Sequence, residues 1–304
     1  MTIIKPQKLK IGDTIGILAV SGQIKEYENI LNAKKFFEKE GFNVVISETC
    51  KTSHRYMAGR NDDECVKTFH DFFENKDINA IVCARGGYGT IRLLDKINWN
   101  TVKNNPKIFA GYSDITALLC MIYKNTGLIT FHSPMCNGDF ASEVDEYTKN
   151  SFFNTLSGNT KKIRAINSKN FYEGSAEGYL FGGNLTVLAS LCGLDFIPDK
   201  NLILFLEDLN EPVYKTDRAL TQLFNIKEIK ERVKGISIGE FKDVNDTQML
   251  NTVINEFAQK IKIPVCDGFR ITHNKTKDTI PLGANAIFNS SLGEISLTES
   301  YVSD

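Results

Sequence analysis

Ser113 stands in a very short connection between an apolar strand and an apolar helix, where a serine can act as a nucleophile. The run 108–110 predicts a buried strand and 115–123 predicts an apolar helix, so only residues 111–114 connect them. So tight a turn holds a side chain out from the sheet edge, beside the first backbone N–H groups of the helix. The usual elbow pattern Gly-x-Ser-x-Gly is incomplete here, because Ile115 stands at its last position. The segment therefore allows a nucleophile with half of an oxyanion hole, or a serine that simply caps the helix.

An activated serine needs a base, and the chain has four histidines. His54 lies in a polar loop and His70 on a polar helix, so both are interpreted as surface residues. His132 follows the predicted strand 128–131 and can approach the edge of the sheet where strands end. His273 lies in a loop between two short apolar segments. The residues alone leave the choice of base open.

Carboxylates that could orient the base follow the apolar segment 202–206. Glu207 and Asp208 come directly after it, and Glu211 follows one turn later. A carboxylate at the mouth of a buried strand is either a hydrogen-bonded structural acid or an active-site group. For Glu207 the pattern alone leaves both roles open.

Three predicted strands end in short polar or glycine-rich segments, at 20–22, 84–89 and 111–114. The carboxyl ends of parallel strands lie at one edge of a sheet, so we expect these segments to converge on a site. Gly86 and Gly87 would let the backbone approach a ligand closely. The other interpretations are a plain tight turn or a phosphate-binding loop. The phosphate loop is disfavoured because neither Gly-x-Gly-x-x-Gly nor a Lys-Ser/Thr pair occurs.

Composition limits the class of protein. The 304 residues are 42% hydrophobic and 24% charged with a net charge of −1, which argues against a general binder of nucleic acid or membrane surfaces. Seven scattered cysteines form no CxxC pair and predict small core residues in a reducing compartment. No signal peptide or membrane-spanning run is evident, so a cytoplasmic enzyme is expected. We expect no cofactor and no metal, since HExxH and histidine–carboxylate clusters at ligand spacing are lacking.

The elements that must position these residues alternate between strands and helices. This order predicts an α/β fold: an N-terminal doubly wound, largely parallel sheet domain over 1–150, a linker over 151–169, and a smaller C-terminal α/β domain over 170–304, with the active site between them. In the first half, strands are expected at 14–19, 42–47, 79–84, 107–112 and 128–131, and helices at 26–40, 62–74 and 115–123. In the second half, strands are expected at 179–181, 202–206, 235–238 and within 279–300, and helices at 185–191, 217–224 and 249–261.

Taken together, the motifs resemble those of the LD-carboxypeptidase family of serine peptidases, which includes murein tetrapeptide carboxypeptidases and microcin-immunity peptidases. The resemblance spans nearly the whole chain. Its motifs are Gly12-Asp-Thr-Ile-Gly16, Tyr56-Met-Ala-Gly59, Arg85-Gly-Gly-Tyr-Gly89, Gly111-Tyr-Ser-Asp114, Phe131-His-Ser-Pro-Met135, Gly182-Gly-Asn-Leu185, Leu206-Glu-Asp208 with Asp217-Arg218, and Pro281-Leu-Gly283. Each motif is weak alone, but their joint order and spacing are specific. Some members carry glycine where this chain has Ser133, which leaves the nucleophile assignment intact.

The resemblance implies a Ser–His–Glu triad made by Ser113, His273 and Glu207, in the family's chain order of serine, glutamate, histidine. The oxyanion would be met by the backbone N–H of Asp114 and by one from the Gly86–Gly87 pair, with Gly87 favoured.

Further residues are expected at the substrate. Arg85 suits a substrate carboxylate, although a structural ion pair is equally consistent with it. Tyr88, Asn184 and His132 are expected to line the site.

The substrate implied by the resemblance is a short peptide with a D-residue at its free carboxyl end. The expected reaction is release of D-Ala from murein tetrapeptide during cytoplasmic cell-wall recycling. One alternative is an immunity-type peptidase that cleaves a peptidyl-nucleotide antibiotic, and another is a non-catalytic ligand-binding module. No nucleic acid or membrane partner is expected. The sequence does not determine the oligomeric state, and the family commonly forms homodimers.

Overall fold

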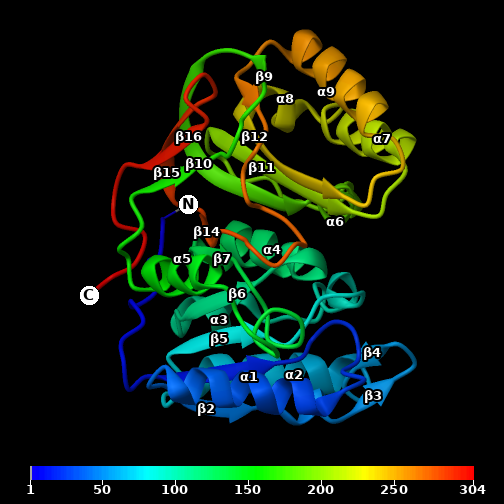
Figure 1. The fold of residues 1–304 in the computed structure, drawn as a ribbon. Helices are drawn as coiled ribbons and strands as arrows, with labels where there is room; N and C mark the ends of the chain where they lie inside the picture. The colour runs from blue at the N-terminus through cyan, green and yellow to red at the C-terminus, as the bar shows by residue number, and fades with distance from the viewer. Residues whose placement is uncertain (1) are drawn as a thin grey trace.

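Two large β-sheets organise the chain, the first built mainly by its N-terminal half and the second by its C-terminal half, beside a small two-stranded sheet (Figure 1). The computed structural model describes residues 2–304. The predicted α/β fold class with two domains is confirmed.

The first sheet has the strand order β14-β7-β6-β5-β1-β2. Its strands are β1 (Thr14–Leu18), β2 (Asn43–Ile46), β5 (Ala80–Cys83), β6 (Ile108–Gly111), β7 (Thr130–His132) and β14 (Ile280–Leu282). All neighbours are parallel except the antiparallel pair β14 and β7. Helices cover both faces: α1 (Tyr27–Lys39) and α5 (Glu146–Leu156) share one apolar cluster, and α2 (Asp62–Glu74), α3 (Trp99–Asn104) and α4 (Thr116–Thr126) share another. This is the doubly wound arrangement that the alternation predicts.

The second sheet has the order β8-β16-β15-β10-β11-β12-β13-β9. Its strands are β8 (Lys162–Arg164), β9 (Asn170–Tyr172), β10 (Ser175–Asn184), β11 (Leu202–Leu209), β12 (Val233–Lys242), β13 (Val265–Cys266), β15 (Asn285–Asn289) and β16 (Glu294–Leu297). Strands β10 to β13 are parallel, and the remaining neighbours are antiparallel. The helices of this half are α6 (Leu185–Ser190), α7 (Val213–Leu223), α8 (Lys227–Arg232) and α9 (Thr247–Ile261).

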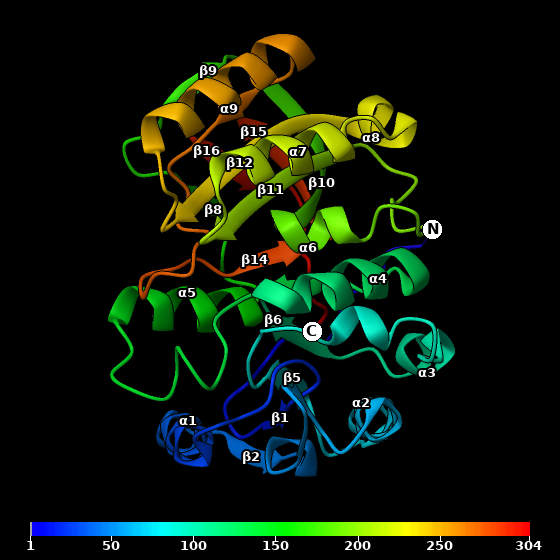
Figure 2. The same cartoon turned by 90° about the vertical axis from the view of Figure 1, so that its right-hand side faces the viewer.

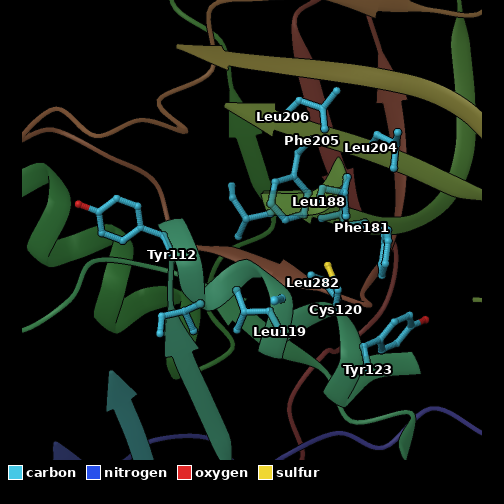
Figure 3. Packing of buried hydrophobic residues seen from close by; sticks show 14 of the residues in the cluster. Tyr112, Leu119, Cys120, Tyr123, Phe181, Leu188, Leu204, Phe205, Leu206 and Leu282 are labelled. Carbon is cyan, nitrogen blue, oxygen red and sulfur yellow. The ribbon is translucent and has the colours of Figure 1, made fainter. Parts of the chain in front are cut away.

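Helix α4 lies between the two halves, facing α6 and the second sheet (Figure 2). Its side chains are buried nearly all round, which explains why its sequence shows no polar face. Leu119 and Cys120 of α4 pack in one cluster with Leu188 of α6, Phe205 of β11 and Leu282 of β14 (Figure 3). The helix that follows Ser113 is therefore the layer through which the two halves meet.

Three features differ from the expectations. Strand β14 leaves the C-terminal half and completes the first sheet beside β7. The expected linker 151–169 contains the end of α5 and strand β8, which pairs with β16. Strand β11 continues past residue 206 to include Glu207 and Asp208, because Glu207 pairs with β10 and Asp208 with β12, and both side chains are buried. Each difference comes from long-range pairing or burial that local patterns do not report.

Over residues 2–304, none of the helices combines the length and the apolar character needed to cross a bilayer.

Candidate active site

Ser113 occupies a strained turn between β6 and α4. Its φ is +61°, in the left-handed region that a residue with a side chain adopts only when its surroundings enforce it. A short 3-10 turn, η3 (Ser113–Ile115), follows Tyr112 and leads directly into the helix. No side chain caps η3 or α4, and over residues 2–304 no group hydrogen-bonds to Ser113 Oγ. Ser113 therefore caps no helix, and the turn has the geometry that a nucleophile would need.

Gly86 packs directly against this turn. A Cβ at position 86 would lie 2.9 Å from Ser113 Oγ and 3.4 Å from the Asp114 backbone nitrogen. Only glycine therefore fits there without displacing the serine. The Gly86 carbonyl accepts a hydrogen bond from Gly22 N at 3.1 Å, and Gly87 has a φ of +117°. Since carbonyl and N–H point in opposite directions across a trans peptide, the Gly87 N–H points away from Gly22.

The Asp114 side chain ties the three converging strand ends together. Its Oδ2 accepts hydrogen bonds from Ser21 Oγ at 2.6 Å and Thr90 N at 3.0 Å, and its carbonyl accepts one from Thr90 Oγ1. Burial raises the pKa of the Asp114 carboxyl, and the hydrogen bonds from Ser21 and Thr90 oppose that shift. Asp114 therefore fixes the turn from behind, while its backbone nitrogen remains on the side of Gly86 and Ser113.

Glu207 and His273 form a buried pair in the C-terminal half. Glu207 Oε2 lies 2.7 Å from His273 Nδ1. The Glu207 side chain is fully buried, and the His273 side chain is 11% exposed. A carboxylate in this place favours the tautomer with the proton on Nδ1, which leaves Nε2 as the proton acceptor. This pairing suits a general base oriented by an acid.

Tyr112 joins this pair to the serine. Its ring centroid lies 4.8 Å from that of His273, and its backbone leads directly into Ser113. Thr116 of α4 makes a second link between the serine turn and the pair. Its Oγ1 accepts a hydrogen bond from Asn184 N at 3.0 Å, and Asn184 lies opposite Glu207 where β10 pairs with β11. No hydrogen bond joins Ser113 Oγ to His273 anywhere in the described chain. Such bonds often tighten only once substrate is bound.

Asp208, the neighbouring acid, has a structural role. Its two oxygens accept hydrogen bonds from Asn184 Nδ2 at 2.9 Å and from the backbone and hydroxyl of Thr186. Asn184 in turn caps α6 by accepting from Val187 N at 3.0 Å. The predicted site residue Asn184 is thus buried, with its side chain committed to holding the start of α6 and the end of β11.

His132 is buried behind the site rather than presented to it. Its ring packs edge-on against Tyr112 and Phe205, with centroid distances of 5.9 and 5.5 Å, and its Nδ1 has no partner in the described structure. Burial, with smaller contributions from His273 and Lys277, lowers the pKa of His132 to about 3. His132 is therefore a neutral packing residue at pH 7.

The His132→Phe variant is expected to lose less stability in acid than the wild-type protein. The unfolded imidazole titrates near 6.5 and the folded one near 3. Between these values the unfolded state binds a proton that the native state does not, so stability falls as the pH drops through this window. At pH 4 the loss is about 3 kcal/mol. Urea unfolding of both proteins at pH 7 and pH 4 measures it, and equal losses in both would contradict the assignment.

The remaining predicted residues lie at the same edge of the sheet. Arg85 is half-buried and donates from Nη1 to the Gln23 carbonyl at 2.8 Å; within residues 2–304 no carboxylate pairs with it. Tyr88 is exposed, and its ring lies 5.9 Å from the exposed ring of Tyr56. Tyr56 belongs to the turn between β3 (Ser53–His54) and β4 (Met57–Ala58). Arg85 and Tyr88 thus remain available to a ligand.

Two residues close to His273 are not identified by sequence reasoning. The sequence pattern places Tyr112 only in the turn, and it places Lys277 in a polar loop. Lys277 is 2% exposed, whereas Lys275 two residues earlier is exposed. No local pattern distinguishes the two lysines.

Two family models match the chain. Residues 15–133 match the LD-carboxypeptidase N-terminal domain, and residues 177–288 match the LD-carboxypeptidase C-terminal domain. The first match carries Ser113, and the second carries Glu207 and His273.

Similar proteins have names of two kinds. A probable murein peptide carboxypeptidase of Bacillus subtilis is 34% identical over 94% of this chain and 91% of its own. A solved structure of muramoyltetrapeptide carboxypeptidase from Oxalobacter formigenes superposes with a TM-score of 0.85 at 29% identity, covering 93% of this chain and 97% of that one. A structure of MccF in complex with glutamyl sulfamoyl guanosine superposes with a TM-score of 0.90 at 26% identity, covering 98% and 99%.

Proposed function

The chain belongs to the LD-carboxypeptidase family and is a peptidase, and from this premise we propose that it releases the C-terminal D-alanine of murein tetrapeptide. The observation that carries the proposal is the buried Glu207–His273 pair, 2.7 Å between Oε2 and Nδ1, packed on Tyr112 directly before the strained Ser113. The murein name of the relative with 34% identity supports this substrate class.

The residues divide the reaction as follows. His273 Nε2 takes the proton of Ser113 as Oγ attacks the carbonyl of the residue before the D-alanine, and Glu207 stabilises the imidazolium that forms. The same proton then passes to the leaving amine of D-alanine, leaving an acyl-enzyme on Ser113. Water, deprotonated by His273, releases the shortened peptide and restores the serine.

The oxyanion is met by backbone donors. We assign this role to two backbone N–H groups. One is that of Asp114, which lies next to Gly86 and Ser113, and the other is that of Gly87, which points away from Gly22. One such donor contributes a factor of about 10²–10³ in rate. Glycine at 86 and 87 then serves two purposes, because it allows the contact and the positive φ at once.

Arg85 and Tyr88 are proposed to bind the substrate. The Arg85 guanidinium has no carboxylate partner in the described structure, which suits the free carboxylate of the D-residue. The exposed Tyr88–Tyr56 pair offers an amphipathic rim for the rest of the peptide. We place the reaction in the cytoplasm, since all seven cysteines are unpaired and six of them are buried.

Digestion of murein tetrapeptide and its all-L analogue, followed by mass spectrometry, tests the proposal. We expect tripeptide plus D-alanine from the native peptide only, and nothing from Ser113→Ala. An aminoacyl sulfamoyl nucleoside is the competing substrate, favoured by the likeness to MccF in complex with glutamyl sulfamoyl guanosine. Its cleavage by wild type, with the tetrapeptide left intact, would instead establish the immunity-type activity.

A further inference from the structure

A buried lysine lies directly behind the base. Lys277 is 2% exposed, and its Nζ donates to Asp139 Oδ1 at 2.6 Å and to Tyr112 Oη at 3.1 Å. The ammonium also lies 4.2 Å from the centroid of the Tyr112 ring. Removing two charges from water is unfavourable, and an apolar pair of similar volume often stabilises a fold equally well. The Lys277–Asp139 pair therefore calls for an explanation beyond stability.

The three residues come from three different segments, two of which carry residues of the triad. Lys277 follows His273 by four residues on the same loop, Tyr112 immediately precedes Ser113, and Asp139 lies in the loop after β7. In Figure 3 the Tyr112 hydroxyl points away from the apolar cluster around Leu119. The hydroxyl accepts its hydrogen bond from Lys277 Nζ, which is not part of that apolar cluster.

Both ends of the ion pair are held firmly. Asp139 Oδ2 accepts from Met135 N at 2.8 Å, and this loop is bonded to the end of β5 through Cys136 N and the Cys83 carbonyl. On the other side, Lys277 N donates to Thr148 Oγ1 at 3.0 Å. Thr148 belongs to α5 of the first half. The loop of the base is thus attached to the half that carries the nucleophile.

The consequence concerns the angle of the imidazole. Glu207 holds His273 only through Nδ1, which leaves the ring free to tilt about that bond. The Tyr112 ring, at 59° to the imidazole and 4.8 Å away, limits this tilt. Lys277, itself held by Asp139, in turn fixes the Tyr112 ring by its hydroxyl and its face.

We propose that Lys277 is a positioning residue, which is anchored by Asp139 and acts through Tyr112 to hold His273 in register with Ser113. The inference rests on the proposed triad. It adds that the reach of the base toward the nucleophile is set by an ion pair between the two halves of the chain.

The test compares Lys277→Met with Lys275→Met, a matched change at the exposed neighbouring lysine. We expect Lys277→Met to lower kcat on the tetrapeptide, and the rate of Ser113 labelling by a fluorophosphonate, by about 100-fold with little change in KM. Lys275→Met should leave both unchanged. A change in KM with kcat and the labelling rate unaltered would overturn the proposal.

A double variant separates positioning from stability. In Lys277→Met/Asp139→Asn no unpaired carboxylate is buried, and the amide oxygen introduced at position 139 can still accept from Met135 N. The melting temperature should therefore recover relative to Lys277→Met. We expect kcat and the labelling rate to stay low in this variant. Recovery of both together with the melting temperature would show a merely structural role.

A readout that needs no substrate keeps this inference distinct from the proposed function. The Nδ1 proton of His273, observed by ¹⁵N-edited NMR and assigned by its loss in His273→Ala, should be sharp in wild type and Lys275→Met. It should broaden or vanish in Lys277→Met. An unchanged resonance in Lys277→Met would overturn the inference. If it is lost while wild type cleaves neither substrate, the positioning role stands and only the substrate assignment fails.

Discussion

Ser113→Ala and His273→Ala are each expected to lower kcat on the order of 10⁶-fold, as for the serine and histidine of other serine peptidases. In the proposed mechanism Ser113 attacks only while His273 removes its proton, so loss of either residue abolishes the same step. The double variant should therefore be little slower than either single one. Steady-state kinetics on the preferred substrate, with melting temperatures to confirm folding, measures these effects.

The chain offers matched controls for both changes. Ser133 is a buried serine just after β7, whose Oγ donates to the Pro134 carbonyl at 3.1 Å, and His54 is exposed. Ser133→Ala and His54→Ala should retain nearly full activity. If the effects of Ser113→Ala and His273→Ala multiplied in the double variant, the two residues would not act as one unit and the triad assignment would fail.

Glu207→Gln is expected to lower kcat by about 10⁴-fold with little change in fold. An amide NH₂ facing Nδ1 favours the tautomer that carries its proton on Nε2, and this imidazole cannot accept the serine proton. The amide also cannot stabilise the imidazolium. Because glutamine has nearly the same shape, the fully buried site should remain packed. Measuring kcat, and kcat/KM as a function of pH, for both proteins tests this prediction.

Asp208→Asn is the control beside it in the same strand. Asp208 accepts hydrogen bonds from Asn184 and Thr186, so its loss should destabilise the fold by about 1–3 kcal/mol. The folded fraction should keep its activity. A Glu207→Gln variant with activity within tenfold of wild type would assign Glu207 to structure instead.

Most of the strands and helices of the first half can be predicted from local sequence patterns. The strands near 14–19, 42–47 and 79–84 and the helix at 62–74 are predicted within one or two residues of their observed bounds. Strands alternating with amphipathic helices report burial on both faces of a parallel sheet, which is a local property. The strands of the second half are harder to predict, because β8, β9 and β13 are only two or three residues long and are held by their neighbours in the sheet.

The tight turn that carries Ser113 can be found from sequence because it depends on neighbouring residues. A strand, a turn of four residues and an apolar helix place Ser113 at the sheet edge, and the glycines at 86 and 87 mark a close backbone approach. The identity of the base cannot be found in this way. His132 and His273 are equally suitable by local pattern, and the resemblance, not the residues, favours His273.

The sequence by itself determined the α/β alternation, the tight turn at Ser113 and the apolar character of the helix that follows it, since each depends on residues close together in the chain. That Ser113 caps no helix was decided by the tertiary structure. Only the tertiary structure decided which acid faces which histidine. Glu207 and His273 are 66 residues apart, and they meet because parallel pairing in the second sheet buries Glu207. It also decided that His132 is neutral packing and that Lys277, not Lys275, is buried. Charge, tautomer and reach depend on which groups surround a side chain, and those groups come from distant parts of the chain.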